Sequence, residues 1–283
     1  MDDIRLKNIE RSIIKKYRNT LWAPFVQAVD DYKLIQEGDK IAVCISGGKD
    51  SFLMAKLVQE LQKHWLVKFE AVFIVMNPGY TEEVLNKIKE NAQILDIKIE
   101  IFETKIFDIV YKEEKSPCYL CARMRRGYLY REALKRGCNK IALGHHFDDV
   151  IETSLMSMLF GSQIQTMMPK LPSDNVLGME LIRPMYKIKE KDIISWAKHN
   201  ELEFIRCACK FTEDISVSKD DSIRKEMKEL IASLKKKYPN IDVNIFNSMN
   251  NVNLNMVLGY KLDDKKYYFL DNYEEKKESK SKG

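Results

Sequence analysis

Two adjacent glycines interrupt the chain where a run of apolar residues gives way to a segment of helical periodicity. The apolar run is Lys40–Ile45, and apolar residues recur at helical spacing from Phe52 onward. Between them stand Ser46, Gly47, Gly48, Lys49, Asp50 and Ser51. A strand that ends in such a turn and enters a helix directs backbone N–H groups and the positive end of the helix dipole at one point. Because this geometry binds phosphate, the sequence predicts a nucleotide site at this loop.

The loop is not a Walker A sequence, which has four residues between its glycines and then Gly-Lys-Ser/Thr. It resembles the S-G-G-x-D-S pyrophosphate loop of the PP-loop ATP pyrophosphatase superfamily. Members of that superfamily adenylate a carbon–oxygen group of the substrate and release pyrophosphate. The resemblance implies that Ser46 to Ser51 bind ATP and that Asp50 acts in catalysis. The simpler alternative is a capped glycine turn before an ordinary helix, with Asp50 as a first-turn charge.

Apolar runs separated by segments of helical spacing indicate the fold class. The expected strands are Lys40–Ile45, Phe69–Val75, Ile97–Phe102 and Lys140–Gly144, and the expected helices begin at Thr81 and run over Arg123–Arg136 and Asp148–Phe160. This alternation is typical of an α/β protein with a doubly wound parallel sheet, here of the PP-loop or adenine-nucleotide α-hydrolase-like kind. Ligands of such sheets bind beyond the carboxyl ends of the strands. Because Ser46 and His145 each follow a strand, we expect them to share one crevice.

The expected domain organisation has four parts. They are an N-terminal helical segment at 1–36, a catalytic domain at 37–215 with a C-x-x-C insertion, a helical C-terminal segment at 216–262 and a charged tail at 263–283. Helices are expected at Lys189–His199, Ser222–Lys237 and Ile245–Leu258. The tail is poor in apolar residues, so we expect it to be disordered.

Composition limits the class of protein. The chain has 283 residues, 45% of them hydrophobic, which is enough for one large α/β domain. It has no apolar run long enough to span a membrane and no signal peptide after Met1, so we expect a cytoplasmic protein. In a reducing compartment its six cysteines are free thiols or metal ligands. The formal net charge of +5 permits a nucleic-acid partner without establishing one.

Four of the cysteines have a spacing that suits metal ligation. Cys118 and Cys121 form a C-x-x-C pair after a proline, and Cys207 and Cys209 follow later in the chain. Such a pair is typical of a redox site, half a zinc site or cluster ligation, and four thiolates together would also suit a structural zinc ion. By contrast, Cys44 lies within a predicted strand and Cys138 at a predicted helix end, so we expect neither to be a ligand.

From Cys118 to Pro184 the chain resembles the tRNA 2-thiocytidine synthetase (TtcA) family. The matching segments read C-Y-L-C-A-R-M-R-R-G-Y-L-Y, K-I-A-L-G-H-H-F-D-D-V-I-E-T, M-M-P-K-L and I-R-P-M. The resemblance covers most of the chain and implies a 4Fe–4S cluster held by three cysteines, with one iron open to sulfide. Cys118 and Cys121 match the family directly. The third ligand is Cys209 or Cys207, since this chain has C-x-C where the family has C-x-x-C, and ligation by both would close the site.

Carboxylates and histidines follow the fourth predicted strand. Asp148 and Asp149 at a strand end beside ATP phosphates are suited to holding Mg²⁺, whereas either could instead cap the following helix. The resemblance places Gly144 and His145 at the nucleotide and gives Asp149 a catalytic role. His146 is expected to be packed or to lie near the ligand.

A basic segment follows the C-x-x-C pair. It contains Arg123, Arg125, Arg126, Arg131, Lys135 and Arg136. A solvated helix face and a contact surface for RNA phosphates both explain such a run. The resemblance implies that Arg125 acts at the reaction centre, where it would polarise the target carbonyl or stabilise charge. We expect Arg123, Arg126 and Arg183 to contact RNA; Arg183 could instead pair with an acidic neighbour.

The resemblance implies an ATP-dependent tRNA sulfurtransferase that adenylates cytidine, at position 32, and replaces its O2 with sulfur. Its cofactors would be ATP, Mg²⁺ and a 4Fe–4S cluster. Its partners would be tRNA and a sulfur donor such as a cysteine desulfurase or inorganic sulfide; no membrane is implied, and a homodimer is compatible. The alternatives are a PP-loop enzyme acting on another tRNA base or small molecule, and a non-catalytic protein that binds zinc, ATP and RNA.

Overall fold

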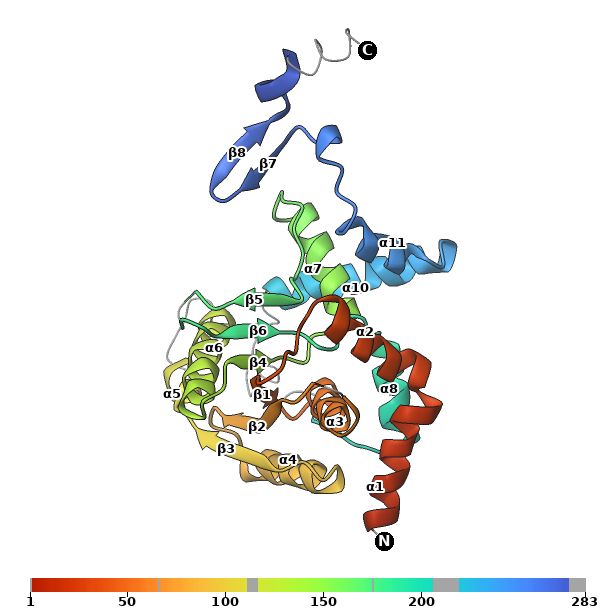
Figure 1. Ribbon diagram of the computed structural model, residues 1–283, viewed down its shortest axis with the longest axis vertical. Helices are drawn as coiled ribbons and strands as arrows, with labels where there is room; N and C mark the ends of the chain where they lie inside the picture. Colours follow the sequence, from red (N-terminus) through yellow and green to blue (C-terminus); the bar gives the residue numbers. More distant parts are fainter. Residues whose placement is uncertain (1, 66, 111–116, 175, 206–218, 275–283) are drawn as a thin grey trace. The chain divides into compact units, whose positions relative to one another are not determined.

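The computed structural model describes residues 2–65, 67–110, 117–174, 176–205 and 219–274, and the chain divides into two compact units after Ala232 (Figure 1). The helices of the first unit are α1 (Asp2–Arg11), the π-helical turns η1 (Ser12–Lys16) and η2 (Arg18–Trp22), α2 (Ala23–Asp31), α3 (Lys49–His64), α4 (Glu82–Ile94), α5 (Ile106–Val110), α6 (Pro117–Lys135), α7 (Phe147–Leu159) and α8 (Glu190–His199). Its strands are β1 (Lys40–Ile45), β2 (Glu70–Asn77), β3 (Ile99–Glu103), β4 (Lys140–Ala142), β5 (Lys170–Pro172) and β6 (Glu180–Ile182). The helix α10 (Lys219–Lys237) crosses the boundary between the units. No helix within these ranges is both long and apolar enough to cross a membrane.

These strands of the first unit form one sheet in the order β3-β2-β1-β4-β6-β5. Neighbouring strands pair in parallel, except that β5 and β6 are antiparallel. From β1 the chain builds outward to β2 and β3, and it then returns to add β4 on the other side of β1 (Figure 1). The switch point of a doubly wound sheet therefore lies between β1 and β4. The expected fold class is confirmed.

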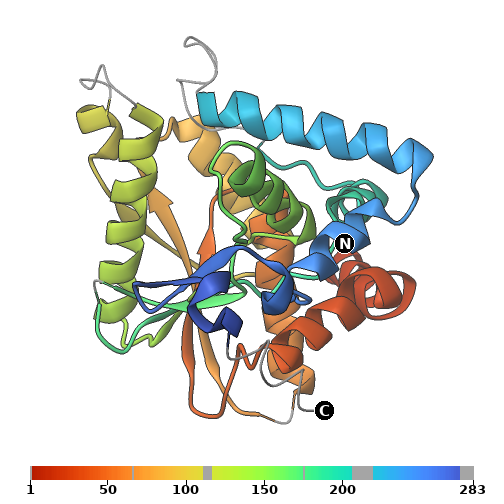
Figure 2. The same ribbon diagram turned by 90° about the horizontal axis from the view of Figure 1, so that it is seen from above.

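Helices cover both faces of this sheet, and each face has its own apolar core (Figure 2). Alternate residues of β1 point to opposite faces, so Val43 joins one core and Ala42 the other. The larger core packs β1 and β2 against α3, α4 and α8, with Phe52 and Trp196 fully buried. On the opposite face, Tyr130 and other residues of α6 pack against the sheet. Burial on both faces explains why β1 reads as a continuous apolar run.

The N-terminal segment is helical, as expected for residues 1–36, but it is not a separate domain. Ile13 and Phe25 are fully buried in the same core as Phe52 of α3. The buried ammonium group of Lys56 in α3 also donates to Glu10 Oε1 at 2.8 Å. This segment therefore completes the face of the sheet that α3 covers.

The helix after the C-x-x-C pair begins earlier than expected. α6 starts at Pro117, six residues before the expected start at Arg123. Proline suits the first turn of a helix, because its φ is already helical and its missing N–H needs no partner there. As a result, Cys118 and Cys121 belong to the first helical turn instead of a loop.

Two strands were not expected from the sequence. Lys170–Pro172 and Glu180–Ile182 pair with one another, and the second also pairs with β4. Each has three residues, which is too few for an alternating pattern to stand out. They extend the sheet beyond β4, so that β4 is not an edge strand.

The second unit differs from the expected C-terminal helices and tail. It contains α11 (Ile241–Ser248), η3 (Leu254–Met256), β7 (Gly259–Leu262), β8 (Lys265–Tyr268) and η4 (Phe269–Asn272). The expected helix at Ile245–Leu258 is wrong, because α11 ends at Ser248. Disorder from residue 263 is also wrong for the described part of the tail, where β7 and β8 form an antiparallel hairpin. Its Tyr260 and Tyr267 rings stack with their centroids 4.9 Å apart. The expected boundary at 215 lies outside the described residues.

Candidate active site

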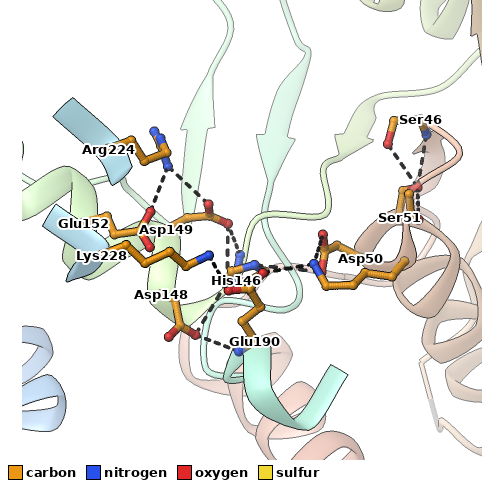
Figure 3. Close-up of polar contacts among 12 residues, drawn as sticks. Ser46, Asp50, Ser51, His146, Asp148, Asp149, Glu152, Glu190, Arg224 and Lys228 are labelled. Carbon is orange, nitrogen blue, oxygen red and sulfur yellow. Dashed lines mark hydrogen bonds and ion pairs between the residues drawn. The ribbon is translucent and has the colours of Figure 1, made fainter. Parts of the chain in front are cut away.

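The loop between β1 and α3 is held in shape by the side chain of Ser51. Ser51 Oγ accepts a hydrogen bond from Ser46 N at 3.1 Å and donates one to Gly48 O at 2.9 Å (Figure 3). Gly48 precedes the first helical residue, Lys49. The first N–H groups of a helix have no partner inside it, so the turn presents them beyond the end of β1. The structure thus has the strand–loop–helix arrangement on which the prediction of a phosphate site depended.

The two glycines of the loop serve different purposes. Gly47 has a φ of +94°, and a Cβ there would lie 3.0 Å from Ile205 Cδ1 and 3.1 Å from Ile88 Cγ1. Gly48 has an ordinary φ of −81°. A Cβ at Gly48 would meet its nearest atom, Ile205 O, at 3.7 Å. The fold therefore requires glycine at position 47, whereas no described residue crowds position 48, where a ligand could approach closely.

We expect Gly47→Ala to lower the free energy of unfolding by about 1–3 kcal/mol, because it combines a positive φ with crowding by two isoleucines. Gly48→Ala is the matched control and should change that free energy by less than about 1 kcal/mol, within the normal range of Gly-to-Ala effects. Urea unfolding of both variants measures the difference. Equal stability of the two variants would contradict the described loop conformation.

The end of β4 lies directly against the start of α3. A Cβ on Gly144 would lie 3.2 Å from Ser51 N and 3.3 Å from the Asp50 carbonyl carbon. This contact brings the residues after β4 beside the loop, where His146 Nε2 lies 3.9 Å from Asp50 Oδ1. The two segments expected to share a crevice are therefore adjacent, and His146 is buried between them.

Both aspartates at the start of α7 bind main-chain N–H groups. Asp149 Oδ2 accepts from His146 N at 2.9 Å, which closes the first turn of α7. Asp148 Oδ2 accepts from Glu190 N at 2.7 Å and so caps a different helix, α8. The capping role therefore applies to both residues. Asp149 Oδ1 also lies 3.3 Å from Arg224 NH1, which leaves Asp149 less available to a metal ion than the sequence suggested.

Asp50 presents an unused carboxylate oxygen to the site. Asp50 Oδ2 accepts from Lys49 Nζ at 3.1 Å. Asp50 Oδ1 is buried and has no hydrogen-bond partner within the described residues. A buried carboxylate oxygen without a partner is costly, so this atom is well placed to bind a cation or a donor supplied with the ligand.

Glu190 joins the loop to the C-terminal helix, a role that the sequence did not reveal. Glu190 Oε1 lies 3.1 Å from Lys49 Nζ, and Glu190 Oε2 lies 2.6 Å from Lys228 Nζ of α10 (Figure 3). Burial by itself would raise the pKa of Glu190, but hydrogen bonds from Lys228 and Lys49 outweigh it and hold that pKa at about 2. From sequence, Glu190 is indistinguishable from any acidic residue in a first helical turn.

Arg224 makes a second link between α10 and the site. Its NH1 atom lies 3.3 Å from Asp149 Oδ1 and 3.4 Å from Glu152 Oε2 (Figure 3). In the sequence, Arg224 lies in a lysine- and glutamate-rich helix and is separated from its partners by more than seventy residues. No local pattern could have indicated this contact.

Two groups near the site, the half-buried His145 and the buried Glu152, have strongly shifted pKa values. Burial is the main cause of the lowering of the His145 pKa from 6.5 to about 4, and Asp149 only partly opposes it. Burial likewise raises the pKa of Glu152 from 4.5 to about 7, despite the opposing charges of Lys228 and Arg224. In the ligand-free protein near neutral pH, His145 is therefore uncharged and Glu152 is partly protonated.

These two groups should oppose each other in the pH dependence of stability. The pKa of His145 is lower in the folded state, so its contribution is lost as the pH falls from 6.5 towards 4. The pKa of Glu152 is higher in the folded state, so its contribution is present below pH 4.5 and lost as the pH rises towards 7. Between pH 4.5 and 6.5 we expect the free energy of unfolding of Glu152→Gln to rise with pH more steeply than that of wild type. In the separate variant His145→Gln, we expect the free energy of unfolding to rise with pH less steeply than in wild type.

Urea unfolding of the metal-free and ATP-free protein at several pH values measures this effect. Other titrating groups are common to all three proteins and cancel when the slopes are compared. Wild-type slopes in both variants would show that neither pKa is shifted in the folded protein.

The arginines of α6 differ in exposure. Arg123 and Arg126 are exposed, as an RNA-contacting surface requires, although an ordinary solvated helix face would look the same. Arg125 is half-buried, with its guanidinium carbon 5.9 Å from the centroid of the Phe107 ring. Its Nε has no acceptor among the described residues. It therefore retains a donor that could serve a substrate, and its catalytic role remains a prediction.

Arg183 lies inside the fold, whereas a residue that contacts RNA would be exposed at the surface. Its side chain is buried, and its guanidinium donates to Met168 O. Burial also lowers the pKa of this arginine. The predicted RNA contact finds no support here, since the side chain holds the segment before β5 from inside the fold.

The cysteines are described only in part. Cys121 is half-buried at the edge of a small apolar cluster that includes Met76, near the carboxyl end of β2. The backbone of Cys118 belongs to the first turn of α6, but its side chain, like all of Cys207 and Cys209, lies outside the described residues. Cys44 lies within β1, as expected, and both Cys44 and Cys138 are buried in the core, where burial raises the pKa of both thiols. No group of three or more metal-binding side chains occurs in the described part of the chain.

Comparison with known proteins places the chain in a family. The PP-loop domain model (ATP_bind_3) matches residues 14–229. A tRNA-cytidine(32) 2-sulfurtransferase of Tolumonas auensis is 35% identical over 244 residues, which cover 84% of this chain and 78% of the relative. The chain belongs to the tRNA-cytidine(32) 2-sulfurtransferase family of PP-loop proteins.

Other relatives in this family match to a similar extent. The tRNA-cytidine(32) 2-sulfurtransferase of Vibrio campbellii is 37% identical over 84% of this chain and 78% of its own length. That of Ralstonia pickettii is 39% identical over 80% of this chain and 70% of its own length. Among solved structures, the U34-tRNA thiolase NcsA from Methanococcus maripaludis, determined with its 4Fe–4S cluster, superimposes with a TM-score of 0.62. The two chains are 23% identical, and the superposition covers 89% of this chain and 79% of the thiolase. This similarity supports the fold alone. The family recognised from sequence is confirmed.

Proposed function

We propose that this family member uses ATP to activate cytidine 32 of tRNA and replaces the O2 atom of that base with sulfur. The observation that carries the proposal is the glycine loop at the switch point of the sheet, in a chain that matches tRNA-cytidine(32) 2-sulfurtransferases over most of its length. The name of those relatives supports the substrate, and the loop supports activation by a nucleotide.

The residues around the loop suit the binding of ATP with Mg²⁺. Backbone N–H groups at the start of α3 would hold the phosphates, with Lys49 beside them. Mg²⁺ commonly takes one or two protein carboxylates and completes its shell with phosphate oxygens and water. Asp50 Oδ1 has no partner within the described residues, and Asp148 uses Oδ2 to cap α8. We therefore favour Asp50 and Asp148 as metal ligands, with Asp149 as the residue that fixes the start of α7.

Activation converts an oxygen that leaves poorly into one that leaves well. Cytosine O2 attacks the α-phosphorus of ATP, the bond to the pyrophosphate breaks, and the base becomes adenylated. Sulfur then adds at C2, and AMP departs with the oxygen. The half-buried Arg125 has an Nε without an acceptor in the described residues and would stabilise the negative charge on the oxygens of the α-phosphate during these steps.

The thiols suit a sulfur-carrying iron–sulfur cluster. Cys118 and Cys121 lie three residues apart in the first turn of α6, and Cys121 reaches the apolar cluster near the carboxyl end of β2. Together with Cys209 or Cys207 they would hold a 4Fe–4S cluster, which when bound supplies sulfur in an activated form that does not diffuse away. Cysteine-only ligation is the donor set typical of such clusters.

The proposed reaction requires two partners, a tRNA substrate and a sulfur donor. The substrate is tRNA, whose single-stranded anticodon loop can present a base to a pocket at low cost. The sulfur comes from a donor such as a cysteine desulfurase or inorganic sulfide. The exposed Arg123 and Arg126 are the candidate RNA contacts in α6.

We expect Gly48→Val to abolish detectable ATP binding while leaving the protein folded. The valine would fill the space that the phosphates must approach, although a Cβ there comes no closer than 3.7 Å to any described residue. Isothermal calorimetry with Mg²⁺ and ATP measures the affinity, and thermal unfolding monitors the fold. An unchanged affinity in folded Gly48→Val would show that the loop does not bind the phosphates.

A further inference from the structure

Helix α10 carries two cations to the acids that surround the loop. Arg224 and Lys228 are four residues apart, so they lie on one face of the helix. Lys228 Nζ lies 2.6 Å from Glu190 Oε2, and Arg224 NH1 lies 3.3 Å from Asp149 Oδ1 (Figure 3). Both residues belong to the first compact unit, which ends at Ala232. The helix therefore forms one wall of the site from within the unit that contains the loop.

Lys228 shares its partner with the lysine of the loop. Glu190 binds Lys49 through Oε1 at 3.1 Å and Lys228 through Oε2 at 2.6 Å. One carboxylate therefore holds two ammonium groups that come from opposite sides of the site. These contacts raise the pKa of both lysines against the lowering effect of burial, so both stay charged.

The two cations on α10 are exposed enough to bind a phosphate group in addition to the carboxylates that they now contact. The side chains of Lys228 and Arg224 are 53% and 40% exposed, so a shift towards a ligand meets little steric resistance. The carboxylates that they contact, above all that of Glu190, would repel the phosphates of ATP unless cations intervene. Arginine and lysine bind phosphate oxygens through short, charge-assisted hydrogen bonds, and arginine can do so with two parallel donors.

Granted ATP binding at the loop, we infer that Arg224 and Lys228 contact the pyrophosphate portion of ATP opposite the backbone of the loop. In the ligand-free protein, Glu190 and Asp149 hold these two cations in place. When ATP binds, the exposed sides of both cations contact the β- and γ-phosphates, and the new contacts to phosphate replace part of those to Asp149 and Glu190. As the bond between the α- and β-phosphates breaks, its electron pair remains on pyrophosphate, and these cations stabilise the added charge.

Lys228→Gln tests this inference, because Lys228 is half exposed and its loss should leave the fold intact. We expect its affinity for ATP and for pyrophosphate, each with Mg²⁺, to fall about tenfold or more, the usual effect of losing one hydrogen bond to a charged group. Affinity for AMP, which lacks the β- and γ-phosphates, should stay at the wild-type value. Calorimetry on the full chain provides all three affinities.

Two further variants separate ligand binding from structure. Lys225→Gln makes the same charge change at an exposed neighbour on α10 and should bind ATP as wild type does. Arg224→Lys keeps the charge but removes the paired donors, and we expect a severalfold loss of affinity for pyrophosphate. Thermal unfolding of each variant shows whether α10 remains docked.

The outcomes are distinguishable. Wild-type affinity for ATP in Lys228→Gln and Arg224→Lys, with lowered thermal stability, would show that the ion pairs only hold the helix in place and would overturn the inference. An equal loss in Lys225→Gln would also overturn it, because general electrostatics would then explain the effect. Absence of ATP binding in the wild type would instead reject the proposed function itself.

Discussion

An Asp50→Ala protein is expected to lose nearly all tRNA-dependent release of pyrophosphate and nearly all formation of thiolated nucleoside. Asp50 Oδ1 is buried beside His146 without a partner in the described residues, and Oδ2 holds Lys49 of the loop at 3.1 Å. Removal of this carboxylate takes away a proposed metal ligand and releases the loop lysine. We expect the rate of adenylation to fall at least about a hundredfold, as for the loss of a residue that stabilises the transition state.

The measurement follows labelled ATP in the presence of tRNA and then digests the tRNA to nucleosides for mass spectrometry. Asp30→Ala is a suitable control, since Asp30 is an exposed aspartate in α2 whose side chain makes a loose 4.0 Å ion pair with Lys33. The control should retain wild-type rates of both steps. Wild-type rates in Asp50→Ala would contradict the adenylation mechanism, because without activation no leaving group is made.

Cys118→Ala and Cys121→Ala are expected to abolish thiolation while they retain some tRNA-dependent release of pyrophosphate. The cysteines serve sulfur delivery, whereas the loop and its carboxylates serve activation, so the two steps should separate. After anaerobic reconstitution, both variants should lose the visible absorbance of an iron–sulfur cluster. Absorbance spectra with iron and sulfide analysis check the cluster, and the labelled-ATP assay checks activation.

The remaining cysteines provide the controls for this series. Cys44→Ala and Cys138→Ala should keep the cluster, because both residues are buried in the core and burial raises the pKa of their thiols. Of Cys207 and Cys209, one should behave as a ligand and the other should not. Equal losses at both positions would indicate a closed site, and a colourless wild-type protein with stoichiometric zinc would favour a structural metal and a non-catalytic role.

Local patterns in the sequence were sufficient to predict the glycine loop and the strands β1 to β4, although not β5 and β6. The strand at Lys40–Ile45 is buried on both faces and so is apolar throughout, and the glycines after it mark the turn. The order of strands and helices then restricts the topology, because parallel strands require crossover connections. The nearness of the glycine loop to the residues after β4, seen at Gly144 and His146, therefore follows from the ends of β1 and β4 alone.

Contacts between distant segments were not predictable in the same way. Lys228 and Arg224 look like charges on a solvated helix, and Glu190 looks like an ordinary first-turn acid. Asp149 stood out in the sequence, but no local pattern pairs it with Arg224. The buried position of Arg183 is likewise set by the packing of the segment before β5, and this changed its expected role. The tail hairpin was missed because its strands, such as Lys265–Tyr268, are short, charged and mostly exposed, so no buried face marks them.

Under the proposed function, this protein makes 2-thiocytidine at position 32 of tRNA and needs ATP to do so. The most direct test incubates the reconstituted protein with unmodified tRNA, a sulfur donor and Mg²⁺, with and without ATP, and analyses the digested nucleosides by mass spectrometry. We expect 2-thiocytidine only in the presence of ATP, and only from tRNA that has cytidine at position 32. Formation of 2-thiocytidine without ATP, or its absence from tRNA under all these conditions, would contradict the proposed function.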